Sequence, residues 1–283
     1  MKRLFDIVFS LVGLLVMAPV ILLFMLLVWL QDFSSPFYLA PRVGRNGQLF
    51  RMVKLRSMVL GADKGGVNST STDDNRITWV GHIIRRYKLD EFSQLWNVLI
   101  GQMSIVGPRP QVQRDVNLYT EKERDLLDVR PGITDLSSIV FSDEGDILEG
   151  SEDPDLRYNQ VIRPWKSRLG LLYIEKQTFF LDIFIILLTV IAIASKSLAL
   201  RGVQGILKKW DADAKLIKVA RRDETLYPYP PPGSNEVAEN LFKRGLCLPS
   251  GTQMTKEVLD FDLIAREKPL KILKPKSNVE ADG

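Results

Sequence analysis

The chain has 283 residues, and its 38 Lys and Arg against 34 Asp and Glu give a formal net charge of +4 at pH 7. This length allows one large domain or two small ones, and the positive charge favours anionic partners such as phosphates or acidic lipids. One cysteine (Cys247) excludes an intrachain disulfide and one histidine (His82) excludes a histidine-rich metal site, while dispersed basic residues without a zinc-finger or RNA-binding motif argue against nucleic acid.

The N-terminal segment is long and apolar. Ile7 to Leu30 contains no charged residue, and its 24 positions exceed the roughly 20 that span a bilayer. Pro19 lies in its middle, where proline removes a helical hydrogen bond and kinks the helix. Cations stand on both sides of the segment: Lys2, Arg3, Arg42, Arg45, Arg51 and Lys54. Because both ends should then stay cytoplasmic, we expect a re-entrant helix broken at Pro19; a helix that crosses the bilayer is the alternative.

Residues 37–56 have the pattern of a β-hairpin. Asn46-Gly47 supplies the two positive-φ residues that a tight type I′ turn needs, and strand-forming residues flank it on both sides. On the second strand, Lys54 and Arg56 are two residues apart and therefore lie on one face. A solvated strand edge, where lysine is common, would account for these two cations without any function.

Adjacent acids occur in the next part of the chain. Gly61–Asn75 is rich in Gly, Ser, Thr, Asp and Asn, which predicts a mobile loop of the length that often forms a lid. Ile77–Leu99 is predicted to be largely helical. Within it, Asp90 and Glu91 stand at the start of an apolar helical pattern, whose members are Phe92, Leu95, Val98 and Leu99.

Cations surround these two carboxylates in the sequence. Arg85, Arg86 and Lys88 precede them, and Arg109 follows between two prolines that restrict its backbone. Carboxylates among fixed cations suit a metal-assisted reaction on a phosphate, with magnesium or manganese as the metal. An ordinary helix cap is the alternative, because acids complement the positive end of a helix dipole. A capping box is not formed, since Ser93 stands where Glu or Gln would be.

A second apolar segment, Phe179–Ala194, contains Asp182 and is too short to span a membrane comfortably. We expect an interfacial helix there because cations flank it, and a core helix is the alternative. The flanking cations are Lys166, Arg168, Lys176 and Lys196. Phe141–Pro154, upstream of this segment, is acidic; we expect a solvated surface loop, and a metal site is the alternative.

Residues 201–283 have a different character from the rest. Leu207–Arg222 predicts one amphipathic helix. Tyr227–Gly233, with the sequence Y-P-Y-P-P-P-G, must be extended and would serve as a spacer or a docking strip. Residues 234–283 end in a Lys- and Pro-rich tail that is expected to be loose. Packing on the preceding domain, self-association into a homo-oligomer and binding of a partner are the roles open to this extension.

Five sequence features occur together in one order. They are the apolar N-terminus, R-V-G-R-N-G-Q-L-F-R-M-V-K-L-R-S-M (Arg42–Met58), K-L-D-E-F-S-Q-L-W-N-V-L followed by V-G-P-R-P (Lys88–Pro110), V-R-P-G-I-T (Val129–Thr134) and F-L-D-I-F-I-I-L-L-T (Phe180–Thr189). Any one of them would be a weak signal. Together they cover roughly residues 1–200 and resemble the bacterial sugar transferase family, the monotopic phosphoglycosyl transferases.

The resemblance implies an enzyme that transfers a sugar-1-phosphate from a UDP-sugar to undecaprenyl phosphate and releases UMP. This would be the first membrane step of glycoconjugate or exopolysaccharide assembly. It implies a location at the bacterial inner (cytoplasmic) membrane, with the catalytic domain facing the cytoplasm, and contact with membrane lipids. A membrane-bound, metal-dependent nucleotide-sugar hydrolase and an inactive scaffold for envelope assembly are the alternatives.

The resemblance also implies roles for individual residues. Asp90 would be the nucleophile that forms an aspartyl phosphosugar intermediate, and Glu91 would assist it as base, metal ligand or modulator. Mg2+, or Mn2+ in its place, would be held by Asp90 and Glu91, because two adjacent carboxylates repel without a cation. The cations expected to bind substrate phosphates are Lys54, Arg56, Arg85, Arg109 and Arg130.

The implied fold is a compact, membrane-associated α/β domain with a small sheet, a re-entrant N-terminal helix and interfacial amphipathic helices. The expected divisions are the membrane helix over residues 1–36, the catalytic domain over 37–200 and the extension over 201–283. The chain departs from the family pattern at Ala18, where the family usually has Ser, and at Phe92-Ser93, where it has Leu-Pro. Arg168-Leu169-Gly170 aligns where the family often carries Asp, so the role of that acid is lost or has moved, for example to Asp155.

Overall fold

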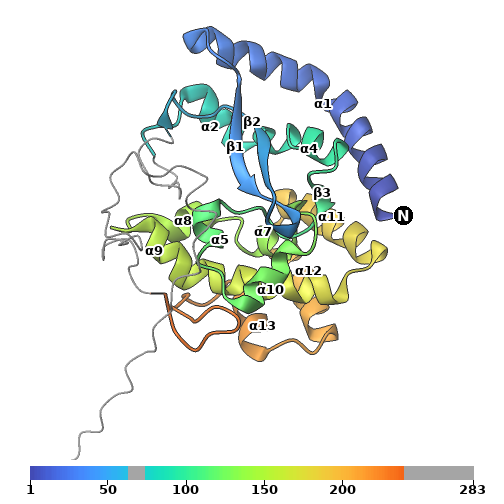
Figure 1. The fold of residues 1–283 in the computed structure, drawn as a ribbon, viewed down its shortest axis with the longest axis vertical. Coiled ribbons are helices and arrows are strands. Elements are labelled where there is room, and N and C mark those ends of the chain that lie inside the picture. Colours follow the sequence, from blue (N-terminus) through green and yellow to red (C-terminus); the bar gives the residue numbers. More distant parts are fainter. Residues whose placement is uncertain (63–73, 239–283) are drawn as a thin grey trace, which may run out of the picture.

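The structure, a computed structural model, describes residues 1–62 and 74–238. The predicted loop Gly61–Asn75 falls mostly on residues 63–73, which lie outside the described residues, as do Cys247 and the predicted tail from residue 239 onward. Within the described part the chain is mostly helical and has two small two-stranded sheets (Figure 1). The expected membrane-associated α/β domain is therefore built mainly from helices.

Strands β1 (Phe37–Val43) and β2 (Leu49–Leu55) form the predicted antiparallel hairpin. Asn46 and Gly47 both have positive φ, 57° and 75°, as their sequence predicts. They lie in a five-residue connection, residues 44–48, which is longer than a two-residue hairpin loop.

The second sheet brings two of the sequence motifs together. Strand β3 (Ser104–Val106) pairs in parallel with β4 (Gly132–Thr134). At the end of this pair the backbones of Gly107 and Gly132 approach so closely that a Cβ on Gly132 would lie 2.1 Å from the Gly107 nitrogen. Only glycine fits there, which explains the glycine in both V-G-P-R-P and V-R-P-G-I-T and places Arg109 beside β4.

The helices are mostly short except near the ends of the described chain. They are α1 (Lys2–Asp32), α2 (Trp79–Arg86), α3 (Leu89–Phe92), α4 (Leu95–Leu99), α5 (Gln113–Val116), α6 (Glu121–Arg124), α7 (Leu136–Val140), α8 (Glu144–Leu148), α9 (Pro154–Arg157), α10 (Arg163–Lys176), α11 (Phe179–Ala194), α12 (Lys196–Lys209) and α13 (Ala214–Arg221). A π-helical segment, Tyr158–Ile162, joins α9 to α10. The acidic segment predicted to be a loop thus contains the short helix α8.

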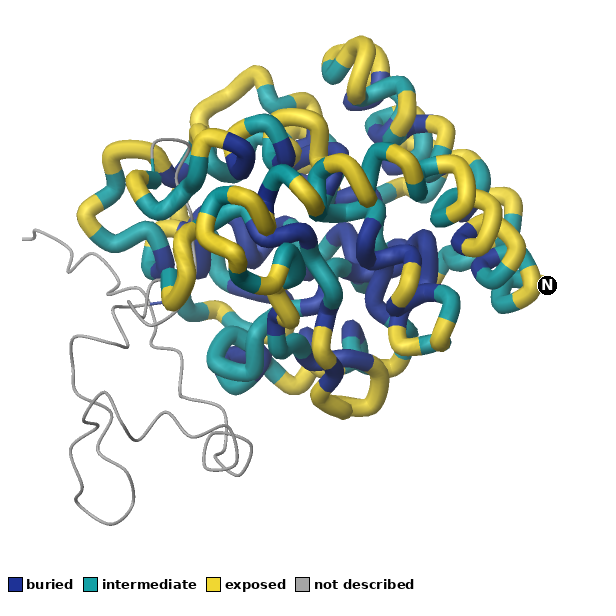
Figure 2. The backbone as a smooth tube through the Cα atoms, turned by 90° about the horizontal axis from the view of Figure 1, so that it is seen from above, coloured by how far each residue is buried: buried dark blue, intermediate teal, exposed yellow. Residues whose placement is uncertain are grey.

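Helix α1 runs along one side of the molecule as a bent rod (Figure 1). Pro19 lies inside it, and the helix continues on both sides, so the expected break at Pro19 does not end the helix. Among the described residues, α1 is the one helix long and apolar enough to cross a membrane. Its outward side is largely exposed (Figure 2). The most exposed apolar residues there are Leu4, Val8, Val12, Leu15, Val16, Leu22, Leu23, Leu26 and Leu30.

Ion pairs attach both ends of α1 to the rest of the protein. At its start, Lys2 Nζ lies 2.6 Å from the buried Asp182 carboxylate of α11. One turn later, the buried Asp6 carboxylate accepts a hydrogen bond from the β3 backbone. At its end, Asp32 pairs with Arg56, just after β2, at 2.5 Å. A cluster of buried side chains packs the second half of α1 on β2, α2 and α3: Val28, Leu55, Val80, Ile84 and Leu89.

The main core lies where α7, α10, α11 and α12 meet, and Ile139, Leu169, Ile185 and Val203 are buried there. Helix α11 spans the predicted segment Phe179–Ala194, and the Thr178 side chain caps its first turn. Buried residues line one side of α11. The other side exposes large apolar side chains: Phe180, Phe184, Leu187, Val190 and Ile193. An interfacial position for this helix stays a prediction.

The C-terminal region differs from its prediction. The prediction of a single helix over Leu207–Arg222 is wrong. The chain turns at Asp211 (φ 51°), so this stretch forms the end of α12 and a separate helix, α13. Helix α12 continues through residue 200, so the expected division at 200 falls inside a helix. The proline-rich strip is irregular and docks on the domain: Tyr229 stacks on Trp165 with ring centroids 4.4 Å apart, and Thr120 donates to the Pro232 carbonyl.

Candidate active site

The two predicted carboxylates lie in the first turn of α3. That helix begins after Lys88, whose left-handed conformation (φ 52°) separates it from α2 and divides the predicted long helix into shorter ones. The Ser93 hydroxyl donates to the Asp90 carbonyl at 2.7 Å and is also 3.0 Å from the Val53 carbonyl of β2. This serine therefore holds the turn that carries Asp90 and Glu91 against the hairpin.

A buried asparagine also fixes this arrangement. The Asn97 side chain of α4 accepts from the Val53 N–H and donates to the Arg51 carbonyl, each at 2.8 Å. It satisfies two backbone groups of β2 that have no strand partner on that side, much as a further strand would. Asn97 belongs to the motif that contains the acids, and its role as a brace was not predicted.

Each acid faces one cation. Lys54 Nζ lies 3.3 Å from Asp90 Oδ2, and Arg109 Nη1 lies 3.2 Å from Glu91 Oε1. The four side chains are between 17% and 29% exposed, so solvent and a ligand can reach them. Arg109 Nη1 also donates to the Ile133 carbonyl of β4 at 3.3 Å. The structure thus brings together Asp90, Glu91, Lys54 and Arg109, as the sequence predicts.

The charges of these groups act on one another. Burial lowers the pKa of Lys54, and the nearby Arg109 and Arg42 lower it further, while Asp90 and Glu91 partly oppose the change. Burial alone would lower the pKa of Arg109, but Glu91 and Asp90 outweigh it and raise that pKa. Both cations therefore respond to both acids, and the site holds closely spaced charges of both signs.

Arg42 was not predicted among the phosphate-binding cations, but its charge acts on Lys54 of this site. Burial is the main cause of its lowered pKa, and Arg109 adds to the effect. Arg42 lies on β1, and the signal for it was present, because it opens the motif Arg42–Met58. It is separated from Lys54 by a hairpin turn, and only the strand register places it in the field of Arg109.

The other predicted phosphate-binding cations divide into two groups. Arg85 donates to the Ser57 hydroxyl at 3.0 Å, and the charge of Asp90 partly offsets the effect of burial, which lowers the pKa of Arg85. Arg85 therefore belongs with the acids. Arg56 instead pairs with Asp32 at the end of α1, and Arg130 donates to the Gly101 carbonyl at 2.9 Å. In this conformation Arg56 and Arg130 hold other parts of the protein.

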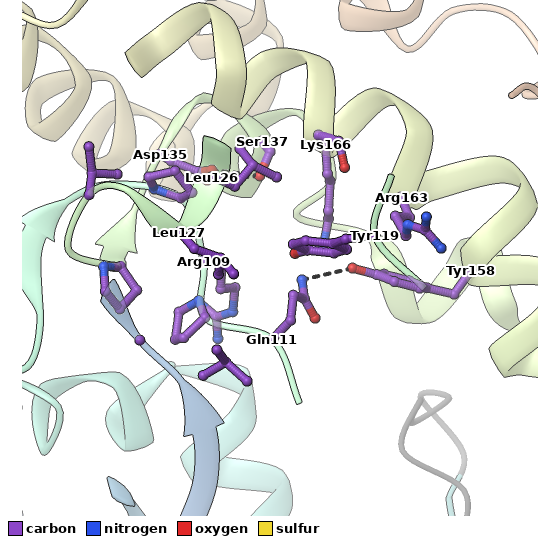
Figure 3. A pocket seen from close by; sticks show the side chains of 17 residues that line it. Arg109, Gln111, Tyr119, Leu126, Leu127, Asp135, Ser137, Tyr158, Arg163 and Lys166 are labelled. Atoms are coloured by element: carbon purple, nitrogen blue, oxygen red, sulfur yellow. Dashed lines mark hydrogen bonds between the residues drawn. The ribbon is translucent and has the colours of Figure 1, made fainter. Parts of the chain in front are cut away.

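A small pocket with both polar and apolar lining residues lies next to Arg109 (Figure 3). Gln111 donates to the Tyr158 hydroxyl at 3.0 Å, and Lys166 reaches toward the pocket from α10 and pairs with Glu144. Lys166, one of the cations predicted to flank the second apolar segment, also lines this pocket. The remaining lining includes Tyr119, Asp135, Ser137 and Arg163. Such amide, hydroxyl and cationic groups can bind the oxygens of a polar ligand beside the acids.

The side chains of this site that could hold a metal ion are those of Asp90 and Glu91. Among residues 1–62 and 74–238, no group of three or more His, Cys, Asp or Glu side chains could hold a metal ion. Mg2+ often binds through only one or two carboxylates together with substrate phosphates and water. Asp90 and Glu91 therefore fit Mg2+ as a substrate-completed site. Asp155, the suggested replacement for the missing family acid, pairs with Arg114 at 2.6 Å instead.

Comparison with known proteins agrees with these motifs. A family model described as bacterial sugar transferase matches residues 1–196. The chain is 35% identical over 205 residues to the uncharacterized sugar transferase EpsL of Bacillus subtilis, a match that covers 72% of this chain and 90% of that protein. It is 39% identical over 153 residues to the UDP-galactose-lipid carrier transferase of Erwinia amylovora, covering 48% and 31%. It is 35% identical over 196 residues to the undecaprenyl-phosphate glucose phosphotransferase of Komagataeibacter xylinus, covering 67% and 35%.

Proposed function

The chain belongs to the bacterial sugar transferase family, and from this premise we propose that it transfers a sugar-1-phosphate from a UDP-sugar to undecaprenyl phosphate, releasing UMP. The names of its relatives support a sugar donor and this lipid acceptor in general. The observation that carries the proposal is the pairing of adjacent carboxylates with Lys54 and Arg109 at a solvent-accessible site. We also propose that the reaction serves the first membrane step of exopolysaccharide or glycoconjugate assembly.

In the first step, an Asp90 oxygen attacks the β-phosphorus of the UDP-sugar. The bond between this phosphorus and the bridging oxygen breaks, and UMP leaves with that oxygen and its electron pair. The product on the protein is an aspartyl phosphosugar. Carboxylate nucleophiles of this kind divide one difficult displacement into two easier ones. Lys54 and Arg109 are placed to bind the phosphate oxygens on which charge accumulates, and Arg85 and Arg42 add positive charge nearby.

In the second step, an oxygen of undecaprenyl phosphate attacks the phosphorus of the intermediate. The bond from that phosphorus to Asp90 breaks, the carboxylate is restored, and the sugar is left on a polyprenyl diphosphate. Glu91 is next to the nucleophile and is held by Arg109, so it is placed to accept a proton from the acceptor phosphate or to hold a metal. Mg2+ bound by Asp90, Glu91 and the diphosphate would neutralise charge between the two phosphates.

Membrane attachment supports this reaction, because a soluble donor and a lipid acceptor meet only at a membrane surface. We propose that α1 is re-entrant at the bacterial inner membrane and that the site faces the cytoplasm. A crossing helix would separate its ends by about 30 Å of hydrocarbon. Yet Lys2 and Asp32, at opposite ends of α1, both pair with residues of the same domain.

The topology can be tested with a cysteine inserted directly after Met1, or with Ser34→Cys, each in a Cys247→Ser background. We expect both to react with an impermeant thiol reagent in inside-out vesicles and neither to react in sealed cells. Reaction of one cysteine from the outer side would refute the re-entrant helix.

The reaction itself is tested by measuring UMP release from detergent-solubilised protein, with Mg2+, a panel of UDP-sugars, and undecaprenyl phosphate present or absent. Multiple-turnover release that requires one UDP-sugar and the lipid is the expected result, and it identifies the sugar; without lipid, release should stop at about one UMP per protein, the amount set by the covalent intermediate. Continued turnover without lipid would instead show the nucleotide-sugar hydrolase. Activity that is unchanged in EDTA would contradict the role of the metal.

A further inference from the structure

A basic groove lies between α12 and α13, away from the acids of α3. It has a volume of about 730 Å³, within the size range of small-molecule sites. Six cations and two acids line it, which leaves four positive charges in excess. The cations are Lys196, Arg201, Lys208, Lys218, Arg221 and Arg222, and the acids are Asp143 and Asp223. Most of this groove lies beyond residue 196, where the family model ends.

The acids of the groove are already neutralised. Asp143 lies 2.8 Å from Lys196 and 3.0 Å from Arg222, and Arg221 lies 2.6 Å from Asp223. Burial raises the pKa of Asp143, but the hydrogen bonds from these two cations outweigh it, so its pKa falls below the usual value. Asp143 therefore stays charged and fixes two cations in place.

The other three cations of the groove are available for a ligand. Arg201, Lys208 and Lys218 are exposed and form no ion pair with any residue in the described part of the chain. In addition, the buried Nε of Arg222 has no hydrogen-bond partner among the described residues, although its side chain is only 11% exposed. The Arg222 guanidinium also lies 5.5 Å from the centroid of the Phe141 ring, so the evidence for an anion site is the three exposed cations, without ion pairs to described residues, that gather in one groove.

One end of the groove lies at the turn between α11 and α12. Ser195 ends α11 and caps α12, so Lys196 of the groove follows Ile193, which is 85% exposed, by only three residues. In Figure 1, α12 lies between α11 and α13. Leu200 and Ile217 give the groove apolar contacts, and its lining contains no aromatic side chain on which a nucleotide base could stack.

We propose that this groove binds the phosphate-bearing headgroup of an anionic phospholipid whose acyl chains lie along the exposed apolar side of α11. The inference rests on the proposed membrane position of α1 and on the predicted interfacial position of α11. Several separate cations near an apolar helix suit an acidic lipid, because each contributes attraction at a negatively charged membrane surface. The groove would hold the C-terminal part of the catalytic domain at the membrane without taking part in the reaction.

The test measures binding of dihexanoyl phosphatidylglycerol, below its micelle concentration, to the full chain in a neutral detergent. Dihexanoyl phosphatidylcholine and inorganic phosphate are titrated in parallel. The groove variant combines Arg201→Gln, Lys208→Gln and Lys218→Gln. Its matched control combines Arg51→Gln, Arg124→Gln and Lys209→Gln, three exposed cations outside the groove with the same loss of charge. Arg201→Gln alone is included as a milder variant.

We expect saturable binding of phosphatidylglycerol, and weaker binding by at least about tenfold in the groove variant but not in the control. An equal loss of lipid binding in both triple variants would show that general surface charge, and not the groove, binds the lipid. That result would overturn the proposal. If inorganic phosphate competes with phosphatidylglycerol at a concentration equal to that of the lipid, the groove binds free phosphate. That result would overturn the proposal that its ligand is a lipid. UMP release is measured on the same samples. A wild-type chain that binds the lipid selectively but releases no UMP would refute the proposed function while the groove stands.

Discussion

Two acid–cation clusters of this protein differ in how completely their charges are satisfied. At the proposed active site, Asp90 and Glu91 each face one cation at 3.2–3.3 Å, with side chains 17–29% exposed. In α6, Glu123 is fully buried and accepts hydrogen bonds from Arg163 at 2.7 and 3.0 Å, from Ser167 at 2.6 Å and from the Thr120 backbone at 3.0 Å.

This difference in hydrogen bonding and exposure separates a cluster that can bind a ligand from a buried cluster that only stabilises the fold. The oxygens of Glu123 have a full set of donors, so no ligand can approach without breaking them. The carboxylates of α3 keep long, partly exposed contacts that a phosphate or a metal can replace. The following predictions test this distinction, beginning with the largest expected effect.

The first change is Asp90→Asn. We expect sugar-phosphate transfer to fall by at least roughly 10³-fold, because an amide cannot replace the nucleophile. Radiolabelled sugar phosphate should no longer become attached to the protein. The thermal midpoint should change little, since the Asp90–Lys54 contact is partly exposed.

UMP release and label capture measure the Asp90→Asn effect, with Asp128→Asn, an exposed acid, as the matched control. Near-normal transfer by Asp90→Asn would show that the intermediate does not form on this residue.

The second change is Glu123→Gln. It leaves Arg163, which is 3% exposed, buried beside a neutral amide, and breaking a buried pair in this way costs about 3–5 kcal/mol. We expect a large fall in thermal midpoint, with activity per folded molecule preserved. Glu121→Gln, an exposed acid of the same helix, should change stability by less than about 0.5 kcal/mol. Equal stability of the two variants would mean that the buried cluster around Glu123 does not stabilise the fold.

A third cluster lies between these two cases. Arg114 lies 2.6 Å from Asp155 but 3.9 Å from Asp115, so one cation serves two acids. Burial raises the pKa of Asp115 to about 6, although Arg114 opposes this. Because the folded state binds this proton more tightly than the unfolded state, the stability due to Asp115 decreases as pH rises from about 4 to 6 and stays low above that.

Asp115→Asn removes this cost. We expect a higher thermal midpoint at pH 7.5, worth at most about 3 kcal/mol, and a smaller gain at pH 5, where wild-type Asp115 is largely protonated. Thermal unfolding at both pH values measures the difference. A gain that is equal at both pH values, or larger at pH 5, would contradict the raised pKa.

The sequence predicted the parts of the molecule that depend on local pattern. The hairpin with Asn46-Gly47, the bounds of α11 and the grouping of Asp90, Glu91 and Arg109 are all signalled by nearby residues. The breaks at Lys88 and Asp211 could not be predicted in this way. Both are non-glycine residues with positive φ, a conformation that tertiary packing imposes against local preference.

Long-range pairs were the other source of error. Arg56 was grouped with Lys54 by strand alternation, but β2 ends at Leu55, and Arg56 then pairs with Asp32, 24 residues earlier. Glu123 and Arg163 are 40 residues apart, and no spacing rule links them. Arg42 was visible within a motif, yet its place in the site depends on the register of β1 against β2. Such contacts follow from the assembled fold.

The smallest expected effect is that of Arg109→Lys. This change tests whether the partly exposed cations of the site bind the donor or stabilise the transition state. Arg109 contacts both Glu91 and the Ile133 carbonyl, and Pro108 and Pro110 restrict its backbone. A planar guanidinium can bind two phosphate oxygens at once, whereas lysine offers a point charge. Losing one of two contacts to the donor should raise its KM roughly tenfold, equivalent to about 1.4 kcal/mol, and change kcat little.

Initial rates of UMP release at varied UDP-sugar concentration separate the effect on KM from the effect on kcat. Arg51→Lys, on the exposed part of β2, is the matched control. A fall in kcat at constant KM would instead mean that Arg109 acts mainly in the transition state, so the contact with Glu91 would be part of the chemistry and not of donor binding.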